Sequence, residues 1–250
     1  QLAERDVYAE THYPRTAGWH ALSVLAGERW KLIQSSETEL YDLANDPLEQ
    51  ANVAAAHAGV VQGMTSRLTA LQAVPAAPTA AVAADASERL RALGYVSGAA
   101  APAGIDPRAP NPARVIAAWA VFEAALGQVN GGRPQDALKS LKELAGRFPD
   151  APVFQTTYGR ALKDAGRPAE AVAVYRQAVA RIRDAGLYHE LAVAARAAGN
   201  VPEALKAEQA ALALEGRNPA ALNGLGLLHA EAGRAAEAAA SFEQAANLDP

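Results

Sequence analysis

The second half of the chain repeats its pattern of polar and apolar residues. An acidic residue followed by alanine occurs at Asp136-Ala137, Glu170-Ala171, Glu203-Ala204 and Glu237-Ala238, at intervals of 34, 33 and 34 residues. A glycine precedes each pair at a fixed distance, at Gly132, Gly166, Gly199 and Gly233. Glycine accepts the left-handed backbone at the C-terminus of a helix. The pattern therefore predicts four helical hairpins, each of which reverses direction at a glycine.

An apolar stripe follows the alanine on one face of the second helix of a hairpin. It contains Leu141 and Leu144 in the first unit, Tyr175 and Ala178 in the second, and Phe242 and Ala245 in the fourth. The third unit departs from this pattern, because Glu208 stands at the aromatic position. A hairpin with one apolar face cannot bury that face alone, so we expect neighbouring hairpins to stack into a superhelix.

These residues resemble the tetratricopeptide repeat (TPR). The resemblance covers residues 118–250, in units of about 118–149, 152–183, 185–216 and 219–250. It implies a mainly α fold, in which a TPR-type α-solenoid of four helical hairpins follows a small α+β fragment. It also implies a concave groove, lined by the first helix of each hairpin, that binds a protein or peptide. The residues expected to face this groove are Thr156, Arg160, Lys163, His189, Arg196, Asn223 and Leu227.

Three of these groove candidates are cationic. Arg160, Lys163 and Arg196 would give the groove a mildly positive floor in an acidic protein. Such a floor favours an acidic segment or a C-terminal carboxylate as the ligand. The alternative is that these charges only solvate a helix face. A third hypothesis, contact of the alanine-rich helices with a membrane surface, is disfavoured because the repeats lack a basic amphipathic face.

The front segment, residues 1–72, has a mixed pattern. Trp30–Gln34 reads as a strand, and Glu39–Leu43 is its expected partner. Asp46 and Pro47 have the residue types of a helix N-cap and first helical position, so we expect a helix from Pro47 to about Leu71 with a break near Ala58. An Ala/Pro-rich linker is expected over 73–112, with a short helix at 87–93, before a solenoid domain over 113–250.

The front segment carries a second resemblance. Leu40-Tyr41-Asp42-Leu43 with Asp46-Pro47-Leu48-Glu49 is similar to the C-terminal subdomain of bacterial sulfatases, as are segments 13–33 and 90–96. The resemblance implies a parent enzyme that hydrolyses sulfate esters at a divalent metal, calcium. Hydrolysis of phosphate esters is the alternative. Its nucleophile would be a formylglycine made in a Cys/Ser-x-Pro-x-Arg motif. This chain contains no such motif, so we expect no catalytic residue and no cofactor in it.

Two functions from different classes follow. In the first, the chain is a protein-interaction scaffold behind a sulfatase-like enzyme. In the second, it is a fragment of a sulfatase whose repeats only stabilise or dimerise the enzyme, so that homo-oligomers form. Because the chain starts at Gln1 and stops at Pro250 in mid-pattern, we expect it to be a piece of a longer protein, with periplasm or cell envelope favoured for the parent.

Composition disfavours several kinds of partner and site. A net charge of −4 and a pI near 5.8 disfavour nucleic acid as a partner, and the absence of cysteine excludes thiolate metal sites and disulfides. No run approaches the roughly 18 apolar residues of a membrane span. His12 and His20 have no recognised ligand spacing, so no metal site is expected.

Overall fold

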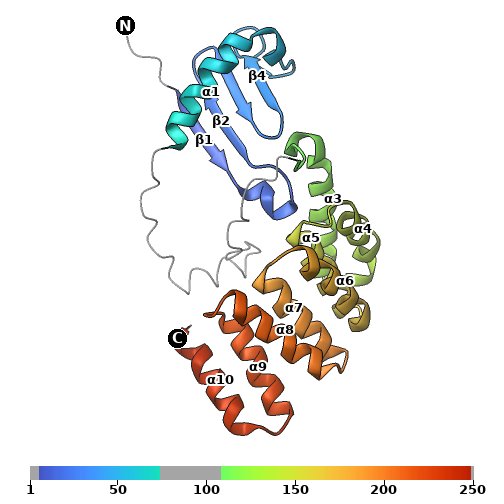
Figure 1. The fold of residues 1–250 in the computed structure, drawn as a ribbon. Coiled ribbons are helices and arrows are strands. Elements are labelled where there is room, and N and C mark those ends of the chain that lie inside the picture. The colour runs from blue at the N-terminus through green and yellow to red at the C-terminus, as the bar shows by residue number, and fades with distance from the viewer. Residues whose placement is uncertain (1–5, 74–107, 249–250) are drawn as a thin grey trace. The chain divides into compact units, whose positions relative to one another are not determined.

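The computed structural model describes residues 6–73 and 108–248 (Figure 1). The chain divides into two compact units. Of the described residues, 6–73 and 108–116 belong to the first unit and 117–248 to the second. Each unit is described by itself below.

The first unit is built on a four-stranded antiparallel sheet in sequential order. Its strands are β1 (Val7–Thr11), β2 (Leu22–Ala26), β3 (Trp30–Gln34) and β4 (Thr38–Asp42). The predicted strand at Trp30–Gln34 and its predicted partner are confirmed, with Leu32 opposite Leu40. Helix α1 (Ala58–Gln72) contributes Met64 and Leu68 to a core with Leu25, Leu32 and Leu40.

The predicted helix from Pro47 is wrong in its first turns. The chain from Pro47 to Val53 is not helical, and Glu49 has a positive φ of 55°. A short 3-10 helix, η2 (Ala54–Ala56), precedes α1. Asp46 accepts a hydrogen bond from the amide of Ala51 at 2.8 Å, and Lys31 on β3 contacts both carboxylate oxygens of Glu49 at 2.7 and 2.8 Å. These contacts to a later loop and to the sheet override the local helix signal.

The described part of the predicted linker lies against the first unit. Asn111 donates to Glu39 at 2.9 Å, and the amide of His20 donates to the carbonyl of Pro110 at 3.0 Å. Helix α3 begins at Pro112, the last residue of the predicted linker. The predicted helix at 87–93 lies outside the described residues.

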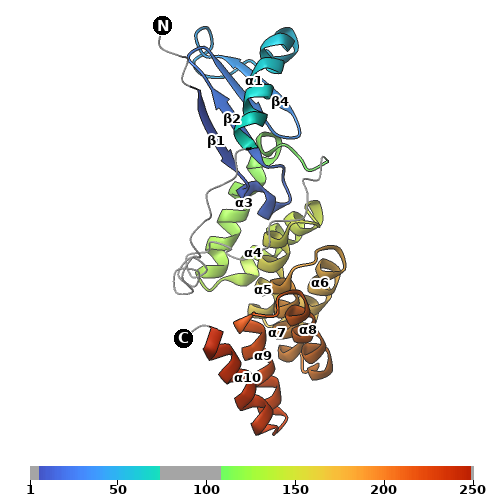
Figure 2. The ribbon, with the colours of Figure 1, turned by 60° about the vertical axis from the view of Figure 1, so that its left-hand side comes forward.

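The second unit is a succession of helical hairpins that lie side by side in both views (Figures 1 and 2). Its helices are α3 (Pro112–Asn130), α4 (Pro134–Arg147), α5 (Pro152–Asp164), α6 (Pro168–Arg181), α7 (Ala185–Ala197), α8 (Val201–Leu214), α9 (Pro219–Glu231) and α10 (Ala235–Leu248). Each helix packs on its sequence neighbours from α4 onward, and α7 also packs on α5 and α9. The chain is mainly α, and the expected TPR-type α-solenoid follows a small α+β unit in the sequence.

Every hairpin turns at its predicted glycine. The φ values of Gly132, Gly166, Gly199 and Gly233 lie between 72° and 76°. At each site the residue after the glycine donates to the carbonyl five positions back, as Arg167 does to Leu162 at 2.9 Å. This Schellman arrangement satisfies carbonyls that a helix end leaves without partners.

Glycine and an aromatic ring pack together inside two of the hairpins. A Cβ on Gly159 would lie 2.3 Å from the ring of Tyr175, and a Cβ on Gly226 would lie 2.5 Å from the ring of Phe242. Tyr175 is 1% exposed, and its hydroxyl donates to the carbonyl of Thr156 at 3.0 Å. Burial, reinforced by the nearby Glu190, raises the pKa of Tyr175 well above its ordinary value. The glycine therefore lets the two helices of a hairpin approach closely.

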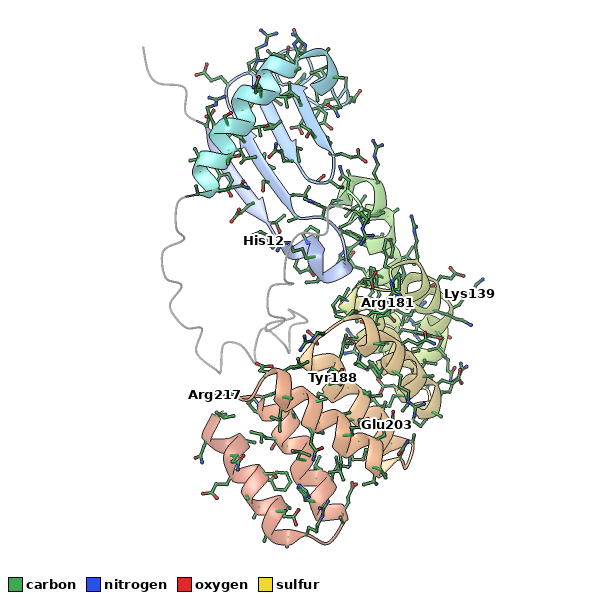
Figure 3. All side chains as sticks on the ribbon, in the orientation of Figure 1. His12, Lys139, Arg181, Tyr188, Glu203 and Arg217 are labelled. Carbon is green, nitrogen blue, oxygen red and sulfur yellow. The ribbon has the colours of Figure 1, made fainter. Side chains whose placement is uncertain are left out.

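Contacts between hairpins are apolar inside and charged outside. The rings of Phe122 on α3 and Phe154 on α5 meet at 5.2 Å in an edge arrangement. On the outside, Arg176 on α6 donates twice to Glu203 on α8 at 2.6 Å. Glu203 is labelled in Figure 3. The apolar contacts bury the faces that no single hairpin can bury, as the sequence pattern predicts.

We expect Gly166→Ala to destabilise the solenoid by about 1–2 kcal/mol, because alanine is strained in left-handed backbone. No atom lies within 4 Å of the position that the new Cβ would occupy, so the cost is conformational alone. Gly146→Ala on α4 is the matched control, since its Cβ also meets nothing and its φ is not positive. The free energy of unfolding of the control should rise by up to about 1 kcal/mol, because alanine favours a helix interior over glycine. Urea denaturation followed by far-UV circular dichroism measures both, and equal effects would contradict the turn assignment.

Candidate functional site

The first helices of the last three hairpins form one continuous surface. Helix α7 packs against α5 on one side and α9 on the other. We call the surface formed by α5, α7 and α9 the inner surface. All seven residues predicted to face the groove lie on these three helices.

A pocket of about 260 Å³ opens on the inner surface between α7 and α9. Four of the seven predicted residues line it: His189 and Arg196 on α7, and Asn223 and Leu227 on α9. Because these side chains come from two successive hairpins, the pocket exists only when the hairpins are stacked. It is smaller than the roughly 300–1,000 Å³ of drug-sized ligand sites. Its size suits a single side chain.

A buried carboxylate also lines this pocket. The side chain of Glu208, on α8, is 2% exposed. His189 is 24% exposed, and its Nδ1 lies 3.0 and 3.1 Å from the two carboxylate oxygens of Glu208. Burial raises the pKa of Glu208 above 4.5, although His189 opposes the rise. Burial also acts to lower the pKa of His189, but the hydrogen bond and charge of Glu208 outweigh it and raise this pKa above 6.5.

The position of Glu208 follows from two departures in the third hairpin. Glu208 stands where the second and fourth hairpins have Tyr175 and Phe242, and Ala192 stands where they have Gly159 and Gly226. The rings of those hairpins lie where a Cβ on the glycine would be, so Ala192 leaves no room for a ring.

The carboxylate of Glu208 instead packs against the next hairpin. A Cβ on Gly224 of α9 would lie 1.9 Å from its Oε1. The third hairpin thus places an acid where its neighbours place an aromatic ring.

The three predicted groove residues on α5 do not join this pocket. Thr156 and Lys163 are half-buried, and the backbone carbonyl of Thr156 accepts from Tyr175. Lys163 Nζ lies 3.3 Å from the adjacent Asp164. Arg160 donates to Asn130 at 3.1 Å.

The cation in the pocket also has a partner. Arg196 on α7 contacts Glu231 on α9 at 2.7 Å. The charges expected to make a positive floor are therefore partnered within the chain. Lys163 and Arg196, which have acidic partners, therefore offer less positive charge to an anionic ligand. The preference for an acidic ligand stays a prediction.

Sequence reasoning singled out Glu208 only as a departure from the repeat and assigned it no role. The signal in the sequence was an acidic residue at a position that the stacked hairpins must bury. Its meaning depends on which neighbour the carboxylate reaches, and His189 lies 19 residues away in the sequence.

Other kinds of site were sought in residues 6–73 and 108–248. No group of three or more His, Cys, Asp or Glu side chains that could hold a metal ion is found there. His12 lies 3.9 Å from Glu10 and is exposed. No helix in these ranges has the length and apolar character needed to cross a membrane.

Comparison with known proteins supports the helical array. Two tetratricopeptide repeat family models match, over residues 131–194 and 189–250. Together with the observed hairpins, they support a TPR array in the second unit. Neither match reaches the first unit, and comparison with the curated proteins gives no match.

The solved structures to which the chain is similar include the following three. MamA from Desulfovibrio magneticus RS-1 shares 20% identity over 53% of this chain and 75% of that chain, with a TM-score of 0.48. A thermophilic TPR protein of Thermus thermophilus shares 23% identity over 53% and 74%, with a TM-score of 0.47. YrrB, titled a TPR protein with an unusual peptide-binding site, shares 18% over 54% and 70%, with a TM-score of 0.46.

The His189–Glu208 pair predicts a pH dependence of stability. A raised pKa in the folded state gives stability that is present below the ordinary pKa and is lost as pH rises through the folded value. Both groups have raised values. The free energy of unfolding of the wild type, measured relative to Glu208→Gln, should therefore fall as pH rises from 4.5 to beyond 6.5.

Chemical denaturation over this pH range measures the difference. Glu243→Gln, which removes an exposed carboxylate on α10, is the control and should show no such trend. A difference between wild type and Glu208→Gln that stays constant with pH would contradict the pairing.

Proposed function

We propose that the second unit is a protein-interaction scaffold that holds an extended segment of a partner protein on the inner surface. The observation that carries the proposal is the pocket between α7 and α9, in which two stacked hairpins bring together His189, Arg196, Asn223 and Leu227. A pocket of this size accepts one side chain of a bound segment, while the neighbouring inner helices offer room for the residues beside it.

The exposed apolar side chain of Leu227 supports this use of the surface. Leu227 is 43% exposed although it lines the pocket, so its contact area is accessible to a partner. Asn223, one helical turn before it, offers both a donor and an acceptor to a peptide backbone. An apolar anchor next to an adaptable amide is the combination expected of a peptide-binding surface.

The sulfatase hypothesis stays a prediction. Both family matches lie in the hairpin array, and the described residues of the first unit offer no contact or cluster that favours hydrolysis. The tetratricopeptide resemblance implies binding without chemistry, and the inner surface can be understood on that basis alone. Finding a Cys/Ser-x-Pro-x-Arg motif in sequence continuous with Gln1 would establish the enzyme.

Selection of peptides on the immobilised full chain tests the scaffold. Peptides recovered from a random library should bind the wild type and lose at least about tenfold in affinity for Leu227→Asp, a loss of about 1.4 kcal/mol. The acid places a charge where the peptide makes an apolar contact, and removing that charge from water costs free energy. Isothermal titration calorimetry measures the affinities.

Leu214→Asp is the matched control. Leu214 ends α8, outside the inner surface, and is 38% exposed, close to the exposure of Leu227. Its substitution should change the affinity by less than about twofold, within the usual range for a residue outside an interface. Equal losses in the two variants, or no selected peptide that binds the wild type, would refute the proposal.

A further inference from the structure

The pocket between α7 and α9 combines an acidic group with apolar walls. Its acidic group is the carboxylate of Glu208. Its apolar lining comes from Ala192, Val193, Ala220, Leu227 and Leu228. A ligand group that fits both must be amphipathic, with an apolar stem and a polar head that donates hydrogen bonds.

We propose that this pocket binds one basic side chain, lysine or arginine, of the segment held on the inner surface, with the carboxylate of Glu208 as its acceptor. The inference rests on the proposed function, since it names the side chain that the scaffold would recognise. Lysine and arginine bury their methylene stems along apolar surface while the charged head reaches a polar partner. The apolar lining and the carboxylate match these two parts.

The hydrogen-bonding capacity of Glu208 supports a donor as the ligand. A carboxylate has two oxygens and about four lone-pair sites. Within the described residues, the hydrogen-bond partner found for both oxygens is one atom, Nδ1 of His189. Each oxygen has further lone-pair sites, so the carboxylate can also accept from an ammonium or guanidinium group, with which it forms a charge-assisted hydrogen bond.

The other charges in the pocket do not oppose a cation. Arg196 is held by Glu231 at 2.7 Å, so its charge is compensated. His189 approaches the carboxylate of Glu208 through one atom, Nδ1, and a carboxylate can accept from a second donor at the same time. An acidic ligand side chain would instead place a second carboxylate beside a buried one, and like charges at close range disfavour each other.

The rest of the array offers an internal comparison. At the equivalent position of the second hairpin, Tyr175 packs on Gly159 and fills the space with its ring. In the third hairpin, Ala192 excludes a ring, and the absence of a side chain at Gly224 gives the carboxylate of Glu208 its place. The two changes together produce an acidic recess at this hairpin in place of an aromatic ring.

Three probe peptides test the inference on the full 250-residue chain. They are N-acetylated, C-amidated heptapeptides that are identical except for a central lysine, glutamine or glutamate. Titration of the ¹⁵N-labelled chain, followed by chemical shifts of amides on α7 and α9, gives the affinities. The lysine peptide should bind at least about tenfold more tightly than the glutamine peptide, the size expected for a charge-assisted contact.

The preference should depend on one carboxylate. Glu208→Gln keeps the shape of the side chain and should reduce the lysine-to-glutamine ratio to within about twofold, whereas the exposed Glu243→Gln should leave it unchanged. The comparison of peptides on the wild type stands even if Glu208→Gln fails to fold.

The outcomes separate the inference from the proposed function. Peptides that shift inner-surface amides with equal affinity, or with the glutamate peptide tightest, would overturn the basic-side-chain inference and leave the scaffold standing. A lysine preference that survives in Glu208→Gln would also overturn it. Shifts confined to α6, α8 and α10 would contradict both.

Discussion

Burial of apolar helix faces between successive hairpins is the interaction on which the second unit depends. Phe122 and Phe154 meet across two hairpins, and Ala171 and Ala204, on the second helices of two hairpins, are fully buried. The glycine turns make this stacking regular because they reverse the chain in the same way each time. A stack of this kind gains stability by nearest-neighbour contacts, and its surface is built from helices that recur along the array.

The pocket is a consequence of that regularity and of one local exception to it. The second and fourth hairpins fill the space behind the first helix with an aromatic ring over a glycine, as Tyr175 and Gly159 do, and the first hairpin has Leu141 at the aromatic position. The third hairpin has neither partner, and the acid that replaces the ring is held by His189. Even a paired buried acid often stabilises a fold less than apolar side chains of similar volume, so the exception should lower stability relative to a ring. Such a cost is understandable where the group serves recognition.

The hairpins and their turns could be predicted because their signals are local. Glycine, proline and the apolar stripe lie within one or two helical turns of the structure that they determine, and all four glycines have the expected backbone. The strand at Trp30–Gln34 and its partner could also be predicted from residue types. The structure of the segment after Pro47 could not be predicted in this way, because Glu49 pairs with Lys31, 18 residues away in the sequence.

The inner surface was predictable in part for the same reason. The tetratricopeptide resemblance implies which residues face inward, and four of the seven residues chosen in this way line one pocket. The partners of the cations were hidden from the sequence, since Arg160 and Arg196 reach residues 30 and 35 positions away in neighbouring hairpins. The charge of Arg196 is compensated by Glu231 once the hairpins stack, whereas Arg160 reaches the neutral amide of Asn130.

In the proposed function, a partner segment lies along α5, α7 and α9. Paramagnetic relaxation from a bound peptide carrying a spin label at one end measures this directly, since it broadens the amides nearest the label without requiring any substitution in the chain. Broadening should be strongest around His189, Asn223 and Leu227 and should move along the inner helices when the label is moved to the other end. Broadening centred on α6, α8 and α10, or spread evenly over the array, would contradict the proposed function.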